Sequence, residues 1–349
     1  MKYVKLFQTH SGYEEYISGE TAAHPNVSYC RQEQEVHYEP MKRDYSKEYL
    51  TFEALSNNVT ISWDARGKWN HTLYPGSPME YSINDGGSWN QVSDGQLTTL
   101  NRGEKMLLRA INNTYAFNDS GTLAVPKFVS NGDFIAYGNI LSIIYGDNFS
   151  ENTTLNGSLP TFAGNEHIVS AENLVMPSEF GVSGSARNMF SDCTNLTAAP
   201  ELPATTLANY CYYSMFAYCT SLTVAPSILP AETLATNCYS YMFNECTNLT
   251  TAPELPATTL ADSCYTGMFF DCDSLTTAPA LPATTLAPSC YVLMFYNCNG
   301  LEREAEVPDI FTPNNRVTDC THMYGETNLT YDAVNGVYPL SAYEIYSPK

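Results

Sequence analysis

The chain has 349 residues, enough for two domains with a buried core. Only 15% of its residues are charged and its net charge is −21. Nucleic acid is therefore not an expected partner, because duplex binding depends on Lys and Arg to displace counterions, and an anionic membrane surface is disfavoured for the same reason. No run of about 18 apolar residues is present, so no membrane-spanning helix is predicted.

Residues 1–45 show little periodicity, and we interpret them as an N-terminal attachment module or arm. A short apolar piece at residues 3–7 favours one strand. The apolar run at the start is too short for the core of a secretory signal. The sequence therefore predicts a protein made in the cytosol and not exported by the general route.

Residues 46–147 have the pattern of an all-β domain. Apolar and polar side chains alternate over residues 49–55, 59–63 and 79–83, as they do in half-buried strands. About seven short strands separated by turns favour an immunoglobulin-like β-sandwich. The further apolar segments lie at residues 106–111, 128–129, 134–137 and 140–144.

Asp85, Gly86 and Gly87 follow one of these segments. They predict a hairpin turn, because primed turns need positive φ and glycine supplies it. A calcium site is the alternative for the same residues, and the turn explains them better.

Residues 148–170 are rich in Asn, Ser, Thr and Gly and are predicted to be a linker or the entry into the solenoid. From there the pair Met-Phe recurs at 189–190, 215–216, 242–243, 268–269 and 294–295, in steps of 26, 27, 26 and 26 residues. A degenerate sixth copy carries Met323-Tyr324. Such a repeat cannot bury its apolar face alone, so residues 171–335 are predicted to stack as a solenoid, followed by a C-terminal tail at 336–349.

Within one repeat, Cys264, Met268 and Cys272 are spaced by four residues, with Phe269 beside Met268. This spacing predicts a short helix with one apolar face, preceded by a cap at Asp262 or Ser263. The following residues 275–282 contain two prolines and suit a short extended strand. The expected fold class is thus mainly β with α+β repeats, an N-terminal β-sandwich followed by a leucine-rich-repeat solenoid.

The segment Met242-Phe243-Asn244-Glu245-Cys246-Thr247-Asn248-Leu249-Thr250 resembles the Cys-containing leucine-rich repeats of BspA-type bacterial surface proteins. The resemblance covers about a third of the chain. It departs from the family pattern where Met replaces Ala before Phe and where Pro-x-Leu-Pro replaces a β-branched strand. The resemblance implies adhesion and protein–protein contact.

The N-terminal half is similar, more weakly, to surface and virion proteins of gut Bacteroidales and their crAss-like tailed phages. The segments behind this similarity are residues 5–10, 25–30 and 81–87, followed by the repeats. It implies a virion surface component such as a head fibre or decoration protein.

The eleven cysteines include four pairs spaced by eight residues. A zinc site prefers closer pairs, and eight residues of helix separate two sulfurs by about 12 Å along its axis. Disulfides between adjacent repeats stay open. The favoured interpretation is two columns of buried thiols, within a repeat core made of Met189, Phe190, Cys193, Cys211, Met215, Phe216, Cys219, Cys238, Met242, Phe243, Cys246, Cys264, Met268, Phe269, Cys272, Cys290, Met294, Phe295 and Cys298.

Four tyrosines each follow a repeat cysteine and form a column of their own: Tyr212, Tyr239, Tyr265 and Tyr291. We take this column as the candidate contact strip if it faces outward, and as core if it faces inward, with a partly buried position favoured. Asn195, Asn248 and Asn328 precede Leu-Thr. They are interpreted as side chains that bond backbone groups at turns, rather than as glycosylation acceptors.

Other chemistry has little support in the sequence. The six histidines are scattered, and no Ser–His–Asp order, nucleophile elbow or Gly-rich phosphate loop is present. Trp63, Trp69 and Trp89 could stack on sugars, but a place in a sandwich core explains them better. We predict no catalytic residue, no cofactor and no metal site.

These observations predict a non-enzymatic structural protein of a virion surface. Its N-terminal region would bind other virion proteins, of the capsid or a fibre, and its solenoid would adhere to a host surface protein or glycan. Self-association as a trimer stays open, since fibres are often trimeric. The alternatives are a BspA-type adhesin on a bacterial cell surface and a glycan-binding or glycan-acting protein.

Overall fold

The computed structural model describes residues 43–64, 79–111, 126–302 and 323, together with the backbone of residues 4–9 and 12–17. The chain divides into two compact units, residues 1–44 and 45–349. The described part is mainly β, as predicted, with several sheets of which none closes on itself. Each described helix falls short of the length and apolarity needed to cross a membrane.

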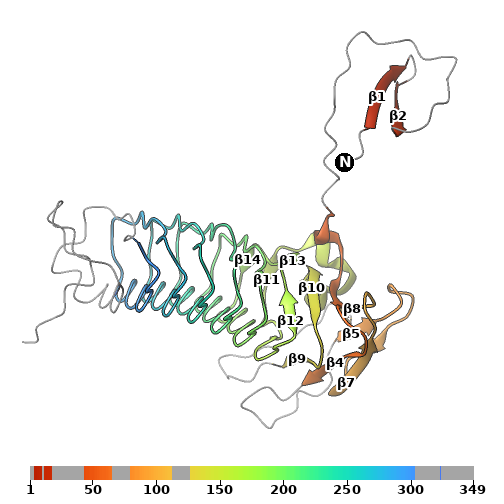
Figure 1. The fold of residues 1–349 in the computed structure, drawn as a ribbon, viewed down its shortest axis with the longest axis horizontal. Helices are drawn as coiled ribbons and strands as arrows, with labels where there is room; N and C mark the ends of the chain where they lie inside the picture. The colour runs from red at the N-terminus through yellow and green to blue at the C-terminus, as the bar shows by residue number, and fades with distance from the viewer. Residues whose placement is uncertain are drawn as a thin grey trace, which may run out of the picture. The chain divides into compact units, whose positions relative to one another are not determined.

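The first unit contains an antiparallel pair, β1 (Val4–Thr9) and β2 (Gly12–Ile17) (Figure 1). The strand expected at residues 3–7 is confirmed by β1. Its partner β2 was not predicted, because Gly12–Ile17 carries two adjacent glutamates that interrupt the apolar alternation.

The larger sheet of the second unit has the order β12-β10-β3-β8-β5-β6, and β13 also pairs with β10. The pairs from β10 to β6 are antiparallel, whereas β12 and β13 run parallel to β10. Of these strands, β3 and β5 coincide with alternating segments of the sequence, and β8 and β10 with its further apolar segments. Their bounds are β3 (Leu50–Ala54), β5 (Met79–Ser82), β6 (Asn90–Gln91), β8 (Lys105–Ala110), β10 (Phe134–Asn139), β12 (Ile168–Ser170) and β13 (Leu174–Val175).

A second, three-stranded sheet has the order β7-β4-β9 and is antiparallel throughout. Its strands are β4 (Val59–Asp64), β7 (Gly95–Leu100) and β9 (Lys127–Ser130). The two sheets share a core, because Phe52 of β3 and Phe128 of β9 lie 4.9 Å apart between ring centroids, nearly perpendicular. Trp63 is buried against Phe128 at 4.9 Å, the core position expected for it.

The apolar run at residues 140–144 ends in a short helix, α1 (Ser142–Tyr145), which continues into η2 (Gly146–Glu151). A one-turn helix, η1 (Tyr45–Lys47), precedes β3. Ser142 fixes α1 to the larger sheet, since its hydroxyl donates to the Leu108 carbonyl at 2.8 Å and accepts the Leu50 N–H at 2.9 Å.

The segment 148–170, expected to be a linker or the entry into the solenoid, is packed. Phe149, Leu155, Phe162 and Ile168 are buried, and β11 (Thr154–Leu155) pairs in parallel with β14 (Glu179–Phe180). Its abundance of Asn, Ser, Thr and Gly reflects tight turns between single buried side chains, which composition alone does not distinguish from a linker.

From there to residue 302, successive turns of the chain lie side by side, coloured from yellow-green to blue in Figure 1. Each turn of about 26 residues is called a coil, and the first to fifth coils contain Met189, Met215, Met242, Met268 and Met294. Single-residue parallel bridges join neighbouring coils, as at Thr251 and Thr277.

The coils continue the large sheet directly. β12 pairs with β10, Ser170 of β12 bridges to Ala198, and Ala198 bridges to Val224. The sheet edge therefore supplies the first hydrogen-bonding partner of the stack. The N-terminal end of the stack is therefore covered by the sheet. One buried core runs from Leu50 to Met323.

Each coil contains a segment, the turn run, that corrects the predicted helix. In the fourth coil it covers residues 261–272. Every second N–H donates to the carbonyl three residues back, as from Met268 to Tyr265 at 3.1 Å. The alternate N–H groups donate to the next coil, as from Phe269 to Met294 at 2.8 Å, so the backbone is satisfied without a helix.

The prediction of a helix was wrong because a period of four residues has two structural origins. In the turn run, Ser263, Gly267 and Asp271 have φ between 55° and 57°, in the left-handed region. An α-helix cannot contain such a residue at every fourth position. Consecutive turns of this kind repeat every four residues, and so bring Cys264, Met268 and Cys272 to one side just as a helix would.

Candidate binding surface

The interior of the coil stack is a column of parallel phenylalanine rings. Phe162, Phe190, Phe216, Phe243, Phe269 and Phe295 stack at centroid distances of 5.3 to 5.6 Å with interplanar angles of 3° to 8°. Stacked aromatic pairs contribute about 0.5–1.5 kcal/mol beyond the burial of their area. All side chains that the sequence assigned to the repeat core are buried. Phe162, which the sequence placed in a linker, is the first ring of the column.

The cysteines that close each turn run have a structural role. The thiol of Cys246 donates to the Phe216 carbonyl at 3.1 Å, and that of Cys272 donates to the Phe243 carbonyl at 3.0 Å. Cys193, Cys219 and Cys298 make the same contact with the preceding coil at 2.8 to 3.2 Å. Each thiol is thus a second donor to a carbonyl next to the ring column, which also accepts the backbone N–H three residues further along the chain. The sequence indicated burial here but not the hydrogen bond.

The nine cysteines in the described residues are free and buried, so no disulfide joins adjacent coils there. Burial raises the pKa of the Cys193 and Cys211 thiols to about 12. Since the thiolate is the nucleophile and the metal ligand, these thiols are inert at neutral pH. Cys30 and Cys320 lie outside the described residues.

The tyrosine column proposed as a contact strip faces inward. Tyr212, Tyr239, Tyr265 and Tyr291 are at most 1% exposed and stack at 5.8 Å with interplanar angles of 4° to 12°. Phe180 covers the first ring at 4.7 Å. These tyrosines therefore cannot contact a partner, which corrects the outward alternative. Along the turn run, buried residues come in adjacent pairs, Cys211-Tyr212 and Met215-Phe216, separated by the partly exposed pair Tyr213-Ser214. Position after a cysteine alone did not give this direction.

Among the described residues, three buried side-chain atoms have no hydrogen-bond partner: the hydroxyl oxygens of Tyr212 and Tyr239, and Nε of Arg187. Burying an unpaired hydroxyl costs about 1–3 kcal/mol. Burial raises the pKa of both phenols well above the ordinary value. The stacking and burial of the rings offset this cost.

A different set of tyrosines lies on the outer side of the turn runs. Tyr210, Tyr213 and Tyr241, with Arg187, form what we call the outer strip, and all four are partly exposed. The Arg187 guanidinium lies 4.6 Å from the centroid of Tyr213 and 5.9 Å from that of Tyr210. Tyr213 packs edge-on against Tyr241 at 6.1 Å. Three successive coils thus contribute to one cluster.

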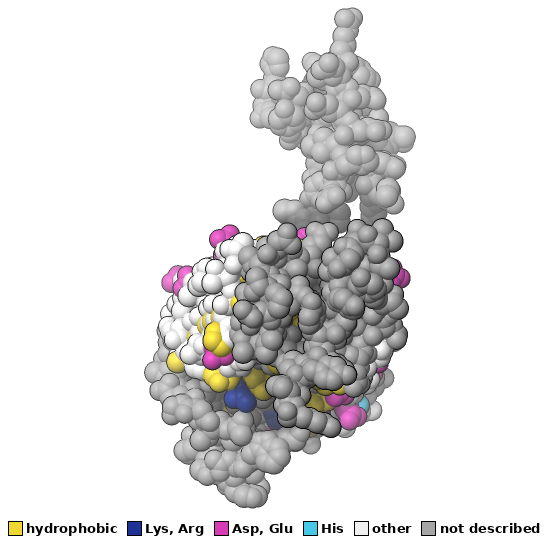
Figure 2. All heavy atoms as spheres, turned by 90° about the vertical axis from the view of Figure 1, so that its left-hand side faces the viewer, with side chains coloured by type: hydrophobic (Ala, Val, Ile, Leu, Met, Phe, Trp, Pro, Cys, Tyr) yellow, Lys and Arg dark blue, Asp and Glu magenta, His cyan; other side chains and the backbone are white. Residues whose placement is uncertain are grey.

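The turn runs of the first, third and fourth coils also carry a carboxylate, in each case three residues after the methionine of the coil. Asp192, Glu245 and Asp271 form what we call the acidic row, and all three are partly exposed. Desolvation, followed by the charges of Asp271 and Asp192, raises the pKa of Glu245. The end-on view of Figure 2 shows acidic side chains in magenta scattered over a described surface that is otherwise largely neutral.

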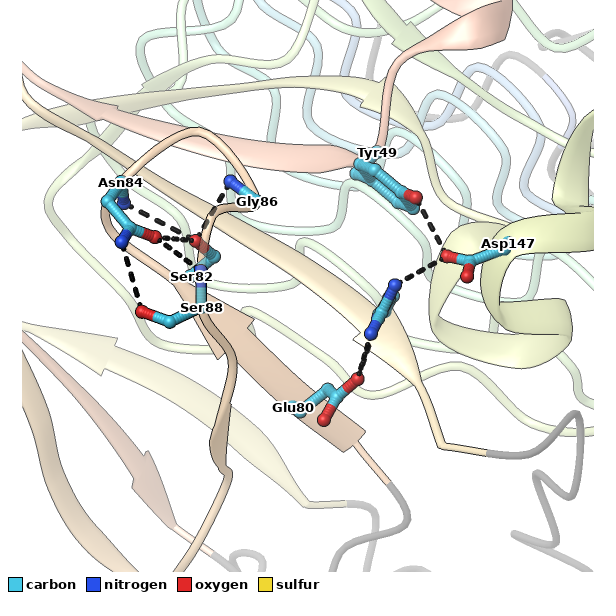
Figure 3. Close-up of polar contacts among 8 residues, drawn as sticks. Tyr49, Glu80, Ser82, Asn84, Gly86, Ser88 and Asp147 are labelled. Atoms are coloured by element: carbon cyan, nitrogen blue, oxygen red, sulfur yellow. Dashed lines mark hydrogen bonds and ion pairs between the residues drawn. The ribbon is translucent and has the colours of Figure 1, made fainter.

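The β-domain contains a separate polar cluster around Arg109 (Figure 3). Its guanidinium contacts Glu80 at 2.6 Å and Asp147 at 2.7 Å, and lies 4.0 Å from the centroid of Trp89. The Tyr49 hydroxyl donates to Asp147 at 2.7 Å, and this bond lowers the pKa of the Asp147 carboxyl. The groups satisfy one another, so the cluster joins η2 to the sheet and does not present a free reactive group.

The neighbouring loop, also in Figure 3, confirms the predicted turn. Asp85 and Gly86 have φ of 54° and 85°, and the Gly87 N–H donates to the Asn84 carbonyl at 3.0 Å, which closes a primed turn between β5 and β6. The Ser82 hydroxyl accepts the Gly86 N–H at 3.0 Å. Turn geometry therefore accounts for these residues.

Other predicted candidates have ordinary contacts. Asn248 donates to the Thr220 carbonyl at 2.8 Å, as expected for a turn residue. His167 faces Asp133 at 3.0 Å. Trp69, Asn328 and the other five histidines lie outside the described residues. Within the ranges that the structure describes, no group of three His, Cys, Asp or Glu is placed to hold a metal ion.

Comparison with protein-family models, with curated proteins and with solved structures gave no match for this chain.

Proposed function

We propose that the chain is a non-enzymatic surface protein of a virion, a head fibre or decoration protein, which displays its repeats to a host surface or partner protein. In this proposal residues 171–335 are a leucine-rich-repeat solenoid and the preceding sheets are an immunoglobulin-like sandwich. The N-terminal region attaches the protein to other virion components.

The observation that carries the proposal is a rigid, uniform stack with a non-uniform outer side. Backbone bonds, the phenylalanine column and the thiol that closes each turn run repeat in every coil, with Phe-to-Phe spacings that differ by only 0.3 Å. At the position two residues before the methionine, by contrast, four coils carry the partly exposed residues Arg187, Tyr213, Thr266 and Val292, and the third coil carries the buried Ser240. A repeated scaffold with differing outer residues suits the display of a specific surface.

The inertness of the thiols and the self-satisfied Arg109 cluster also support a structural role over a catalytic one. The sparsely charged coil surface favours contact with a macromolecule, because few charges must be desolvated. A BspA-type cell-surface adhesin shares these features and is the competing proposal.

Mass spectrometry of density-purified particles, together with surface proteolysis of the cells that make the chain, separates the two. We expect the chain to co-purify with intact capsids in a fixed ratio to the major capsid protein. Its absence from particles, with release from intact cells by protease, would replace the virion role with the adhesin role.

A further inference from the structure

The outer strip of Arg187, Tyr210, Tyr213 and Tyr241, with the adjacent acidic row, combines aromatic area with negative charge on one surface. Both features lie outside the two inner ring columns, and Asp271 also accepts a hydrogen bond from Asn297 of the next coil. The rings contact each other and Arg187, whereas the core is already complete in the phenylalanine and inner tyrosine columns.

We propose that this surface is a protein-binding face, and that its partner presents a basic contact patch. The proposal rests on the proposed function, and adds to it the face that binds and the class of partner that is bound. Tyrosine and arginine, with Asn, Ser and Gly around them, are the residue types enriched at protein contact sites and in paratopes. The strip is bordered by the partly exposed Asn188 and Ser214 on the same turn runs.

Charge complementarity supports a basic partner. In residues 186–300, Arg187 is the one basic residue, and its guanidinium is engaged by two tyrosine rings. None of the ion pairs found in the described parts of the chain involves Asp192, Glu245 or Asp271. A Lys or Arg side chain on a partner would compensate this row, and the attraction would speed association.

The ring geometry favours a protein over a sugar. A sugar-binding platform presents ring faces side by side, but Tyr213 and Tyr241 are inclined at 63° and Tyr210 and Tyr213 at 50°. The Arg187 guanidinium also lies over the Tyr213 ring. The strip therefore offers partly exposed, mutually inclined rings, which suit the irregular surface of a protein better than the flat face of a sugar.

The test measures binding of the labelled full-length chain to intact Bacteroidales cells at low and at high salt, with a charge-matched pair of variants. Glu245→Lys reverses a charge in the acidic row. Glu254→Lys makes the same charge change on an exposed residue of a bridge between coils, away from the turn runs. We expect Glu245→Lys to weaken binding about tenfold at low salt and less at high salt, because salt screens exposed charges. Glu254→Lys should bind as the original chain does.

A second pair and two treatments of the cells complete the test. Tyr213→Ser should also lose about tenfold, and Thr276→Ser, on the exposed bridge side, should lose none. Trypsin treatment of the cells should abolish binding, and periodate oxidation of their glycans should leave it. Equal binding by Glu245→Lys and Glu254→Lys, or loss after periodate alone, overturns the basic-protein inference and leaves the display role intact. Failure of the original chain to bind any cell overturns the proposed adhesion itself.

Discussion

At the scale of single residues, the cysteines show how one residue type serves several needs of a repeat. A thiol is small enough to lie beside the phenylalanine column and still donates to a backbone carbonyl, as Cys246 does to Phe216. Alanine would leave that carbonyl without this donor, and a larger apolar residue would force the coils apart. The spacing of the cysteines therefore reflects packing between coils, not a redox or metal role.

The buried thiols also predict how stability depends on pH. Burial raises the pKa of Cys298 to about 12 and that of Cys246 well above its ordinary value of 9.0. Between pH 9 and 12 the unfolded chain releases thiol protons that the folded chain retains. Stability is thus fully present below pH 9 and is lost as pH rises through this window, by up to about 1.4 kcal/mol per pH unit for each thiol. Thermal unfolding at intervals from pH 7 to 11 checks this.

Removal of one thiol is the control for this prediction. Cys246→Ala should be less stable at pH 7 but should lose stability less steeply above pH 9 than the original chain. An aromatic disulfide reagent at pH 8 should leave the nine described cysteines unmodified until guanidinium is added. A midpoint that is constant from pH 8 to 11 would contradict the assigned burial.

At the scale of elements, the turn run requires a residue with positive φ at every fourth position. Gly267 has φ +57°, and a Cβ on it would overlap the Tyr241 ring of the preceding coil. Gly267→Ala should therefore destabilise the chain by about 1–2 kcal/mol through its backbone, plus the cost of displacing the ring. In a Tyr241→Ser background only the backbone part should remain. Chemical denaturation of the original chain, the two single variants and the double variant gives the coupling energy between the two positions. Additive effects would mean that the Tyr241 ring does not contact residue 267.

Much of the fold could be predicted from the sequence where one pattern has one structural meaning. Alternation identified strands such as β3 and β4, and Asp85-Gly86 identified a primed turn. The four-residue period of Cys264, Met268 and Cys272 has two meanings, and the left-handed residues that decide between them are of mixed types, since Leu293 occupies the position of Gly267. No propensity rule identifies leucine as left-handed.

The candidate surface was missed for a related reason. The buried tyrosines recur in four of the five coils and produce a strong sequence signal, whereas Tyr213 and Tyr241 occur at different positions of their repeats and produce none. Their proximity depends on the way the coils stack. Regularity in a repeat marks the core, and irregular aromatic residues are the better guide to an exposed contact.

At the scale of the whole molecule, the sheets and coils share one core because β12 and Phe162 belong to both. The stack therefore grows from a fixed template and does not need a separate N-terminal cap. Each coil contacts its two neighbours through the same bonds, so the interface between the third and fifth coils would match if the fourth were absent.

Deletion of residues 247–272 tests this modularity, because it removes one full period and joins Cys246 to Asp273 in register. Phe295 would then stack on Phe243 as Phe269 does now. We expect the shortened chain to fold with the same circular dichroism per residue and to unfold cooperatively at a somewhat lower temperature, since one interface is lost. Deletion of residues 247–259 removes half a period, misaligns every later ring and thiol, and should abolish cooperative unfolding of the coils. If both deletions behaved alike, the stack would not be modular. Contacts between adjacent coils would then not account for its stability, and the sheet would have to stabilise the coils in another way.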